Sequence, residues 1–141
     1  MINYLNVVRR SQLAMGIFAA LLVTSQGVMA GQYHSRVDFP YTYSSGITHK
    51  IFIPFDRNAP DGIKIKSVSW SWGRHMNHQS YSVQLCQVLL DVCRNVSHEK
   101  NGSTTIFNFA DASVPFYYLV TSVGRPFNPE WGLTGSMTVN W

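Results

Sequence analysis

Turn signals recur at short intervals after residue 30, and this spacing most constrains what the chain can fold into. The signals are runs of Gly, Asn, Pro and Ser, which favour tight changes of chain direction. They lie at residues 44–46, 58–62, 72–74, 101–103 and 124–126 and at Gly132. The segments between them are rich in Val, Ile, Thr, Tyr, Phe and Trp and show few helix formers at helical spacing. Short strands separated by such turns predict an all-β fold, a small antiparallel β-sandwich or a partly closed barrel.

Alternation of apolar and other residues places the individual strands. It predicts strands at residues 47–53, 63–66, 68–72, 81–85 and 137–141. In the first of these, Ile47, Ile51 and Ile53 share one face. Residues 104–109 are also expected to form a strand. Residues 114–123 are continuously apolar, which is typical of a central strand.

The alternation changes phase near Ser67. Ile63 and Ile65 occupy odd positions, whereas Val68 and the two tryptophans that follow it occupy even positions. A shift of one residue reverses the faces of a strand, so we expect either a bulge near Ser67 or a strand covered on both sides. Residues 31–45 fit an edge strand or a loose arm.

The first thirty residues have the pattern of a cleavable secretory signal peptide. An apolar run of eleven residues, 13–23, follows a short polar segment. Val28 and Ala30 stand at −3 and −1 from a predicted cut before Gly31. The apolar run is well short of the ~20 residues that a spanning helix needs, so a membrane anchor is disfavoured.

Cleavage there divides the chain into a signal peptide, residues 1–30, and one β-sandwich domain, residues 31–141. Arg9-Arg10 precedes the apolar run, so both the twin-arginine and the general export route remain open. The predicted domain has nine Lys and Arg against seven Asp and Glu, a net charge of only +2. Without a basic stripe, nucleic acid is not an expected partner, and no second apolar segment predicts a membrane span.

The two cysteines, Cys86 and Cys93, are expected to form a structural disulfide. Exported chains meet an oxidising compartment, where cysteine pairs usually bond. Closing this loop would stabilise the fold by roughly 2.5 kcal/mol in the chain-entropy model. Their spacing fits neither a zinc site nor a C-x-x-C redox pair. Two free thiols are the remaining alternative.

Apolar residues in two predicted loops suggest surfaces for a partner. Val88, Leu89 and Leu90 lie inside the cysteine loop, where turns are usually polar. The favoured interpretation is that they fold back onto the core, and the alternative is an exposed, partner-binding tip. The second candidate surface contains Arg125, Phe127 and Trp131.

Signals for catalysis or cofactor binding are weak, so we expect a protein that is not an enzyme and holds no cofactor. His75 and His78 have an H-x-x-H spacing, but no H-E-x-x-H pattern, and are weak metal candidates. No nucleophile elbow is present. The aromatic residues Trp70, Trp72, Trp131, Trp141, Tyr117 and Tyr118 fit a core better than a sugar platform. Trp131 is the best exposed candidate for the alternative function, a periplasmic module that binds glycan or another small ligand.

The second half of the chain resembles the flagellar protein FlhE family. The segments that carry the resemblance are 69–72 (SWSW), 82–86 (SVQLC) with Cys93, 101–105 (NGSTT) running into Phe107, 112–116 (ASVPF), the loop GRPFNP, and 138–141 (TVNW). The resemblance implies an exported periplasmic accessory of the flagellar type III export apparatus. It implies contacts with components of that apparatus, a role in limiting proton leak, and support of flagellar assembly and swarming. No catalytic residues come with this family.

Overall fold

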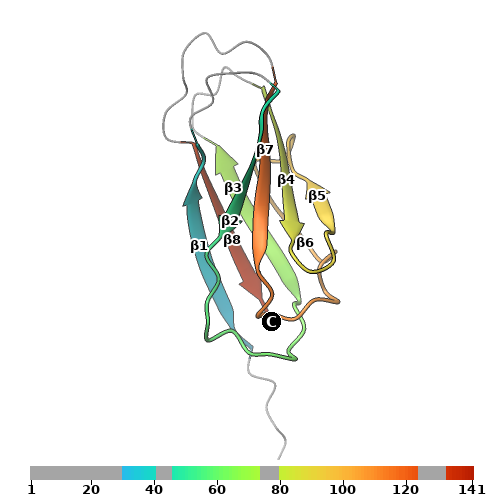
Figure 1. Cartoon of the computed structure of the whole chain (residues 1–141). Coiled ribbons are helices and arrows are strands. Elements are labelled where there is room, and N and C mark those ends of the chain that lie inside the picture. The colour runs from blue at the N-terminus through green and yellow to red at the C-terminus, as the bar shows by residue number, and fades with distance from the viewer. Residues whose placement is uncertain (1–29, 41–45, 74–79, 124–132) are drawn as a thin grey trace, which may run out of the picture.

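The computed structural model describes residues 30–40, 46–73, 80–123 and 133–141, and these contain strands and no helix. The strands are β1 (Gln32–Asp38), β2 (Thr48–Ile53), β3 (Ser67–Gly73), β4 (Ser80–Gln87), β5 (Cys93–Asn95), β6 (Asn101–Thr104), β7 (Phe116–Val123) and β8 (Thr134–Asn140) (Figure 1). This confirms the predicted all-β class. The predicted signal peptide lies, apart from Ala30, outside the described residues, so it stays a prediction.

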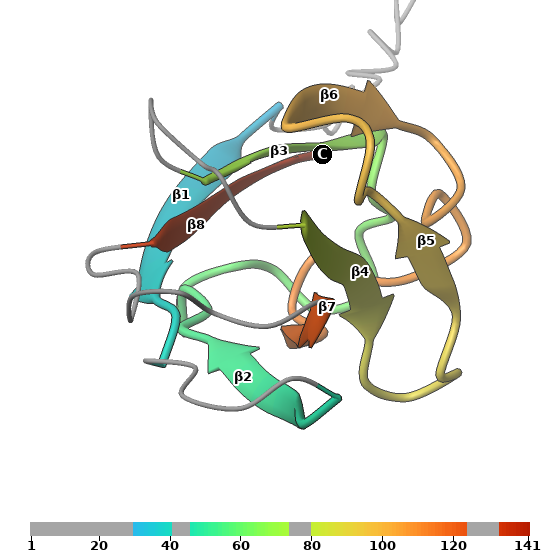
Figure 2. The same ribbon diagram turned by 90° about the horizontal axis from the view of Figure 1, so that it is seen from above.

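The strands form two four-stranded antiparallel sheets, which lie as two layers (Figure 2). The first sheet has the order β1-β8-β3-β6 and the second the order β2-β7-β4-β5. Each sheet ends in two edge strands, so the fold is a sandwich rather than a closed barrel. β7 lies inside the second sheet, as its continuous apolar run predicts, and β1 is an edge strand of the first sheet.

Inward-facing residues of both sheets form one core together with apolar residues of the connecting segments. The largest fully buried side chains are those of Tyr118, Phe107, Phe116, Ile65, Leu85, Met137, Gln87, Val68, Val83, Val96, Val120 and Val139. Edge-to-face ring pairs hold parts of the core, including Phe107 with Phe116 at 5.1 Å between centroids. Burial of each large apolar side chain contributes about 1.5–3 kcal/mol, so this cluster is the main stabilising feature.

A segment between β5 and β6 crosses from the second sheet to the first. Trp72 donates its indole N–H to the Val96 carbonyl at 2.9 Å, and Trp70 donates to the Glu99 carbonyl at 2.8 Å. In the second sheet, the Val83 N–H of β4 donates to the Ser97 hydroxyl of this segment at 2.9 Å. Both buried indoles therefore have hydrogen-bond partners, which is what permits Trp70 and Trp72 to serve as core residues.

The prediction of a strand at residues 104–109 is wrong in position. The strand, β6, covers Asn101–Thr104, and residues 106–109 form turns. The Ile106 N–H donates to the Thr104 hydroxyl at 3.2 Å, a local bond that competes with continued pairing. The turn-forming sequence Asn101-Gly102 is instead held in the sheet by pairing with β3.

Residues 63–66 do not form the expected strand, because they contain a single bridge, between Lys64 and Asp111. β3 begins at Ser67, so the change of phase marks the start of a strand rather than a bulge within one. Neither is β3 covered on both sides, since Ser71 is exposed. Ile47, which the sequence places in the same strand as Ile51 and Ile53, precedes β2 and is 51% exposed.

Candidate functional site

The hairpin of β4 and β5 carries the predicted disulfide. Cys86 and Cys93 are directly paired in the sheet, and a disulfide joins them with an S–S distance of 1.99 Å. Next to them, the Gln87 N–H donates to the Val92 carbonyl at 2.9 Å. The covalent bond and the hydrogen bond together close a short loop formed by residues 88–91.

Within this loop the favoured interpretation, that the apolar residues fold back, is wrong for two of the three. Leu89 is 73% exposed and Leu90 is 60% exposed, whereas Val88 is half-buried. The backbone explains the difference. Val88 N–H donates to the Pro115 carbonyl at 3.1 Å, and Leu90 N–H donates to the buried Gln87 side chain at 2.9 Å. We call Leu89 and Leu90 the hairpin tip.

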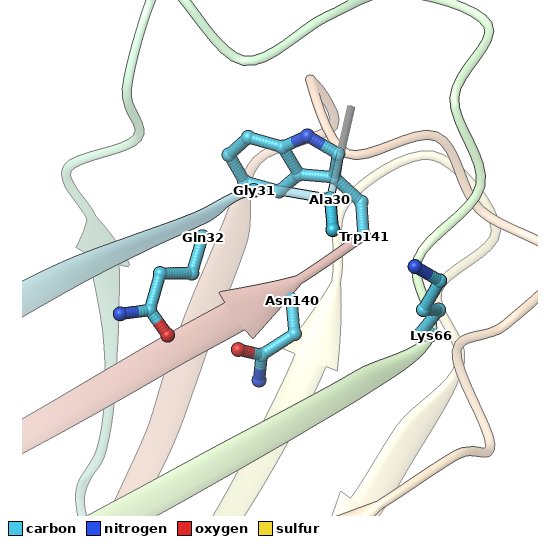
Figure 3. A pocket seen from close by; sticks show the side chains of 6 residues that line it. All are labelled: Ala30, Gly31, Gln32, Lys66, Asn140 and Trp141. Carbon is cyan, nitrogen blue, oxygen red and sulfur yellow. The ribbon is translucent and has the colours of Figure 1, made fainter. Parts of the chain in front are cut away.

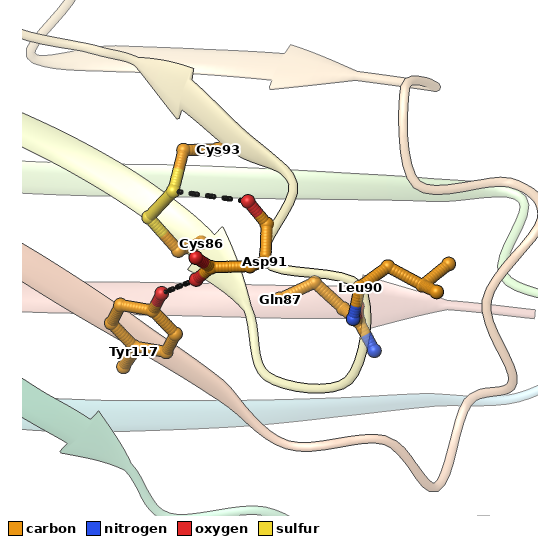
Figure 4. Close-up of a disulfide and its surroundings, with 6 residues drawn as sticks. All are labelled: Cys86, Gln87, Leu90, Asp91, Cys93 and Tyr117. Atoms are coloured by element: carbon orange, nitrogen blue, oxygen red, sulfur yellow. Dashed lines mark hydrogen bonds between the residues drawn. A yellow bond between two sulfur atoms is a disulfide. The ribbon is translucent and has the colours of Figure 1, made fainter.

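Asp91 ends the loop and joins it to the outer face of the second sheet. Its φ of 51° lies in the left-handed region, which Asp tolerates better than most residues. Its carboxylate accepts a hydrogen bond from the Tyr117 hydroxyl, and Leu90 points away from this contact (Figure 4). The bond to Asp91 raises the pKa of Tyr117, with smaller contributions from burial and from the Asp91 charge. Tyr117 therefore stays protonated and holds the loop.

Tyr117 belongs to a row of residues that are paired across neighbouring strands and that reaches the edge strand β2. Tyr117 pairs with Cys86 on one side and with Phe52 on the other, so these side chains share the outer face. Lys50 Nζ lies 3.9 Å from the centroid of the Tyr117 ring and 5.3 Å from that of Phe52. Phe52 is 59% exposed. We call Lys50 and Phe52 the outer-face patch.

The outer-face patch was not among the sites predicted from the sequence. A signal for it was present, because Phe52 alternates with Ile51 and Ile53 and so falls on the polar side with Lys50. Arg125, Phe127 and Trp131, like His75 and His78, lie outside the described residues. Among the residues that are described, no group of three His, Cys, Asp or Glu side chains could hold a metal ion.

The aromatic residues proposed as a sugar platform are buried wherever the structure describes them. These are Trp70, Trp72, Trp141, Tyr117 and Tyr118. No helix in the described ranges is long and apolar enough to cross a bilayer. The hairpin tip and the outer-face patch carry the three most exposed large apolar side chains of the described residues, Leu89, Leu90 and Phe52.

No family model and no curated protein sequence matches this chain. A search of solved structures finds a crystal structure of FlhE, with a TM-score of 0.63 and 15% sequence identity. The chain has the FlhE fold. The similarity covers 79% of this chain and 96% of the FlhE chain, so it includes nearly the whole of that sandwich.

Proposed function

We propose that this chain is a periplasmic accessory protein of the flagellar type III export apparatus. It acts by protein–protein contact, limits proton leak through the apparatus, and supports flagellar assembly and swarming. The observation that carries the proposal is the FlhE fold over almost the full FlhE chain. The Cys86–Cys93 disulfide supports a periplasmic location, because such bonds persist in oxidising compartments.

We place the contact with the export apparatus at the hairpin tip. Leu89 and Leu90 are the two most exposed large apolar side chains of the described residues. The disulfide, the Gln87 bonds and the Asp91–Tyr117 bond hold the loop that carries them. A loop already ordered before binding loses little conformational entropy on contact, which favours affinity. The function requires no catalytic residue.

Deletion of the gene tests the function directly. We expect reduced swarming and, in acidic medium, a lower cytoplasmic pH than in the parent strain, because protons leak inward through the export apparatus. Both defects should be restored by the wild-type gene. A deletion strain with normal swarming and normal cytoplasmic pH would contradict the proposal.

Complementation with surface variants tests the contact. Leu89→Glu and Leu90→Glu together should fail to restore swarming, because two charges replace the apolar contact. Ile106→Glu and Phe109→Glu are the matched control, since these residues are 42% and 39% exposed in a different turn. The free energy of unfolding of both double variants should lie within about 0.5 kcal/mol of the wild-type value, as is usual for surface changes. Full complementation by the tip variant would remove the tip from the contact.

A further inference from the structure

The start of the first sheet coincides with the predicted cleavage point of the signal peptide. Gly31 N–H donates to the Trp141 carbonyl at 3.1 Å, and Trp141 N–H donates to the Gly31 carbonyl at 3.0 Å. β1 begins at the next residue, Gln32, which pairs with Asn140. The nitrogen of the peptide bond to be cut, between Ala30 and Gly31, is thus itself a donor in the sheet.

Side-chain packing reinforces this pairing. A Cβ atom on Gly31 would lie 2.5 Å from carbons of the Trp141 indole, so the ring lies directly against the Gly31 backbone. The ring is buried and packs beside Tyr33, with 6.0 Å between the ring centroids. Figure 3 shows Trp141 beside Ala30 and Gly31, at a hollow of about 360 Å³ that Lys66 and Asn140 also line.

A peptidase needs this same segment in an extended and unpaired form. Proteases that bind a substrate as an added strand form main-chain hydrogen bonds with residues near the scissile bond. A peptide bond already paired in a sheet becomes available only when the strand opens locally. Here the Gly31–Trp141 pair must break and the indole must move, since no spacer residue separates the predicted cut from the sheet.

We infer that the signal peptide is removed before β1 pairs with β8, and that a precursor which folds first retains it. At the moment of cleavage β1 is therefore still unpaired, as it is in a chain that crosses the membrane unfolded. This selects between the two export routes that Arg9-Arg10 leaves open, because the twin-arginine route carries folded chains. The inference rests on the predicted cleavage after Ala30 and is independent of the proposed flagellar function.

The test uses the full precursor, residues 1–141, purified in detergent with its disulfide formed. It is incubated with purified signal peptidase, once folded and once unfolded in a urea concentration that the peptidase tolerates. A second precursor carries about ten Gly and Ser residues inserted after Gly31, which form a flexible spacer and leave the residues around the cut unchanged. Cleavage is followed by mass and by N-terminal sequencing.

We expect equal cleavage of the two unfolded precursors, with Gly31 as the new first residue. When folded, the wild-type precursor should be cut at least about tenfold more slowly than the spacer variant, because cleavage follows the small open population. Equal rates for the two folded precursors would overturn the inference. Failure to cut the unfolded wild type after Ala30 would overturn it as well, by removing the predicted cleavage point.

Discussion

At the scale of single residues, close contacts between aromatic rings and glycine backbone determine how β3 and β6 pack. A Cβ atom on Gly102 would lie 2.5 Å from Cζ2 of the Trp70 ring. That ring cannot easily move aside, because its indole N–H is bonded to the Glu99 carbonyl. Gly102 is therefore required for packing in a strand whose sequence otherwise predicts a turn.

Gly102→Ala should lower the free energy of unfolding by about 1–3 kcal/mol, the usual range for overpacking. Urea unfolding followed by tryptophan fluorescence measures the loss. Ser103→Ala is the matched control, because Ser103 is exposed on the same strand. Its free energy of unfolding should lie within about 0.5 kcal/mol of the wild-type value. Equal stability of Gly102→Ala and wild type would show that the Trp70 contact does not constrain this position.

Three tyrosines should make the fold sensitive to high pH. Burial and then the charge of Asp56 raise the pKa of Tyr33 to about 12, and burial raises that of Tyr118. Tyr117 is shifted in the same direction by Asp91. Since these folded-state pKa values exceed the unfolded value near 10, their contribution to stability is complete below about pH 10. It is lost as the pH rises through the folded-state values.

We therefore expect tyrosinate absorbance from these residues to appear only together with loss of the β-sheet circular dichroism signal. Tyr118→Phe, which removes the hydroxyl bonded to the Ser136 carbonyl, should weaken this dependence on pH. Titration of every tyrosine near pH 10 with the sheet signal intact would contradict the prediction.

At the scale of elements, the β4–β5 hairpin depends on its disulfide, because β5 has only three residues and lies at a sheet edge. Replacing both cysteines, Cys86→Ser with Cys93→Ser, should lower the free energy of unfolding by roughly 2–3 kcal/mol through the entropy of the opened loop. The measurement is urea unfolding of oxidised wild type and variant. A reductant should lower the free energy of unfolding of wild type to that of the variant and leave the value for the variant unchanged. If the oxidised proteins are equally stable, the hairpin does not need the bond.

At the scale of the whole molecule, the two sheets share one core and should unfold together. Tyr118 and Phe116 from the second sheet are buried in the same cluster as Val68 and Met137 from the first. The crossing segment between β5 and β6 adds hydrogen bonds to both layers. Neither sheet can therefore lose its partner without exposing its own apolar face.

The predicted domain should accordingly unfold in one cooperative transition. Tryptophan fluorescence, to which Trp70 and Trp72 of the first sheet contribute, and far-ultraviolet circular dichroism, which reports on both sheets, should give the same midpoint in urea. Two separated midpoints would mean that the sheets are independently stable.

Only part of the candidate site could be predicted from the sequence. The disulfide follows from cysteine spacing and from the predicted compartment, and the structure shows its two residues directly paired in the sheet. The exposure of Leu89 and Leu90 could not be predicted, because it depends on bonds from Val88 to Pro115 and from Leu90 to the Gln87 side chain. The outer-face patch depends on the register between β2 and β7, which brings Phe52 beside Tyr117.

The sequence by itself determined the all-β class, the presence of a central strand within residues 114–123 and the burial of Trp70 and Trp72, because alternation and apolar content reflect which faces are covered. Only the tertiary structure decided that Asn101-Gly102 belongs to a strand, that residues 63–66 do not, and that the hairpin tip is exposed. Asn101-Gly102 is held by pairing with the distant strand β3, and the hairpin tip is held by the distant bond from Val88 to Pro115 together with the local bond from Leu90 to Gln87. Local propensities are too weak to outweigh such contacts.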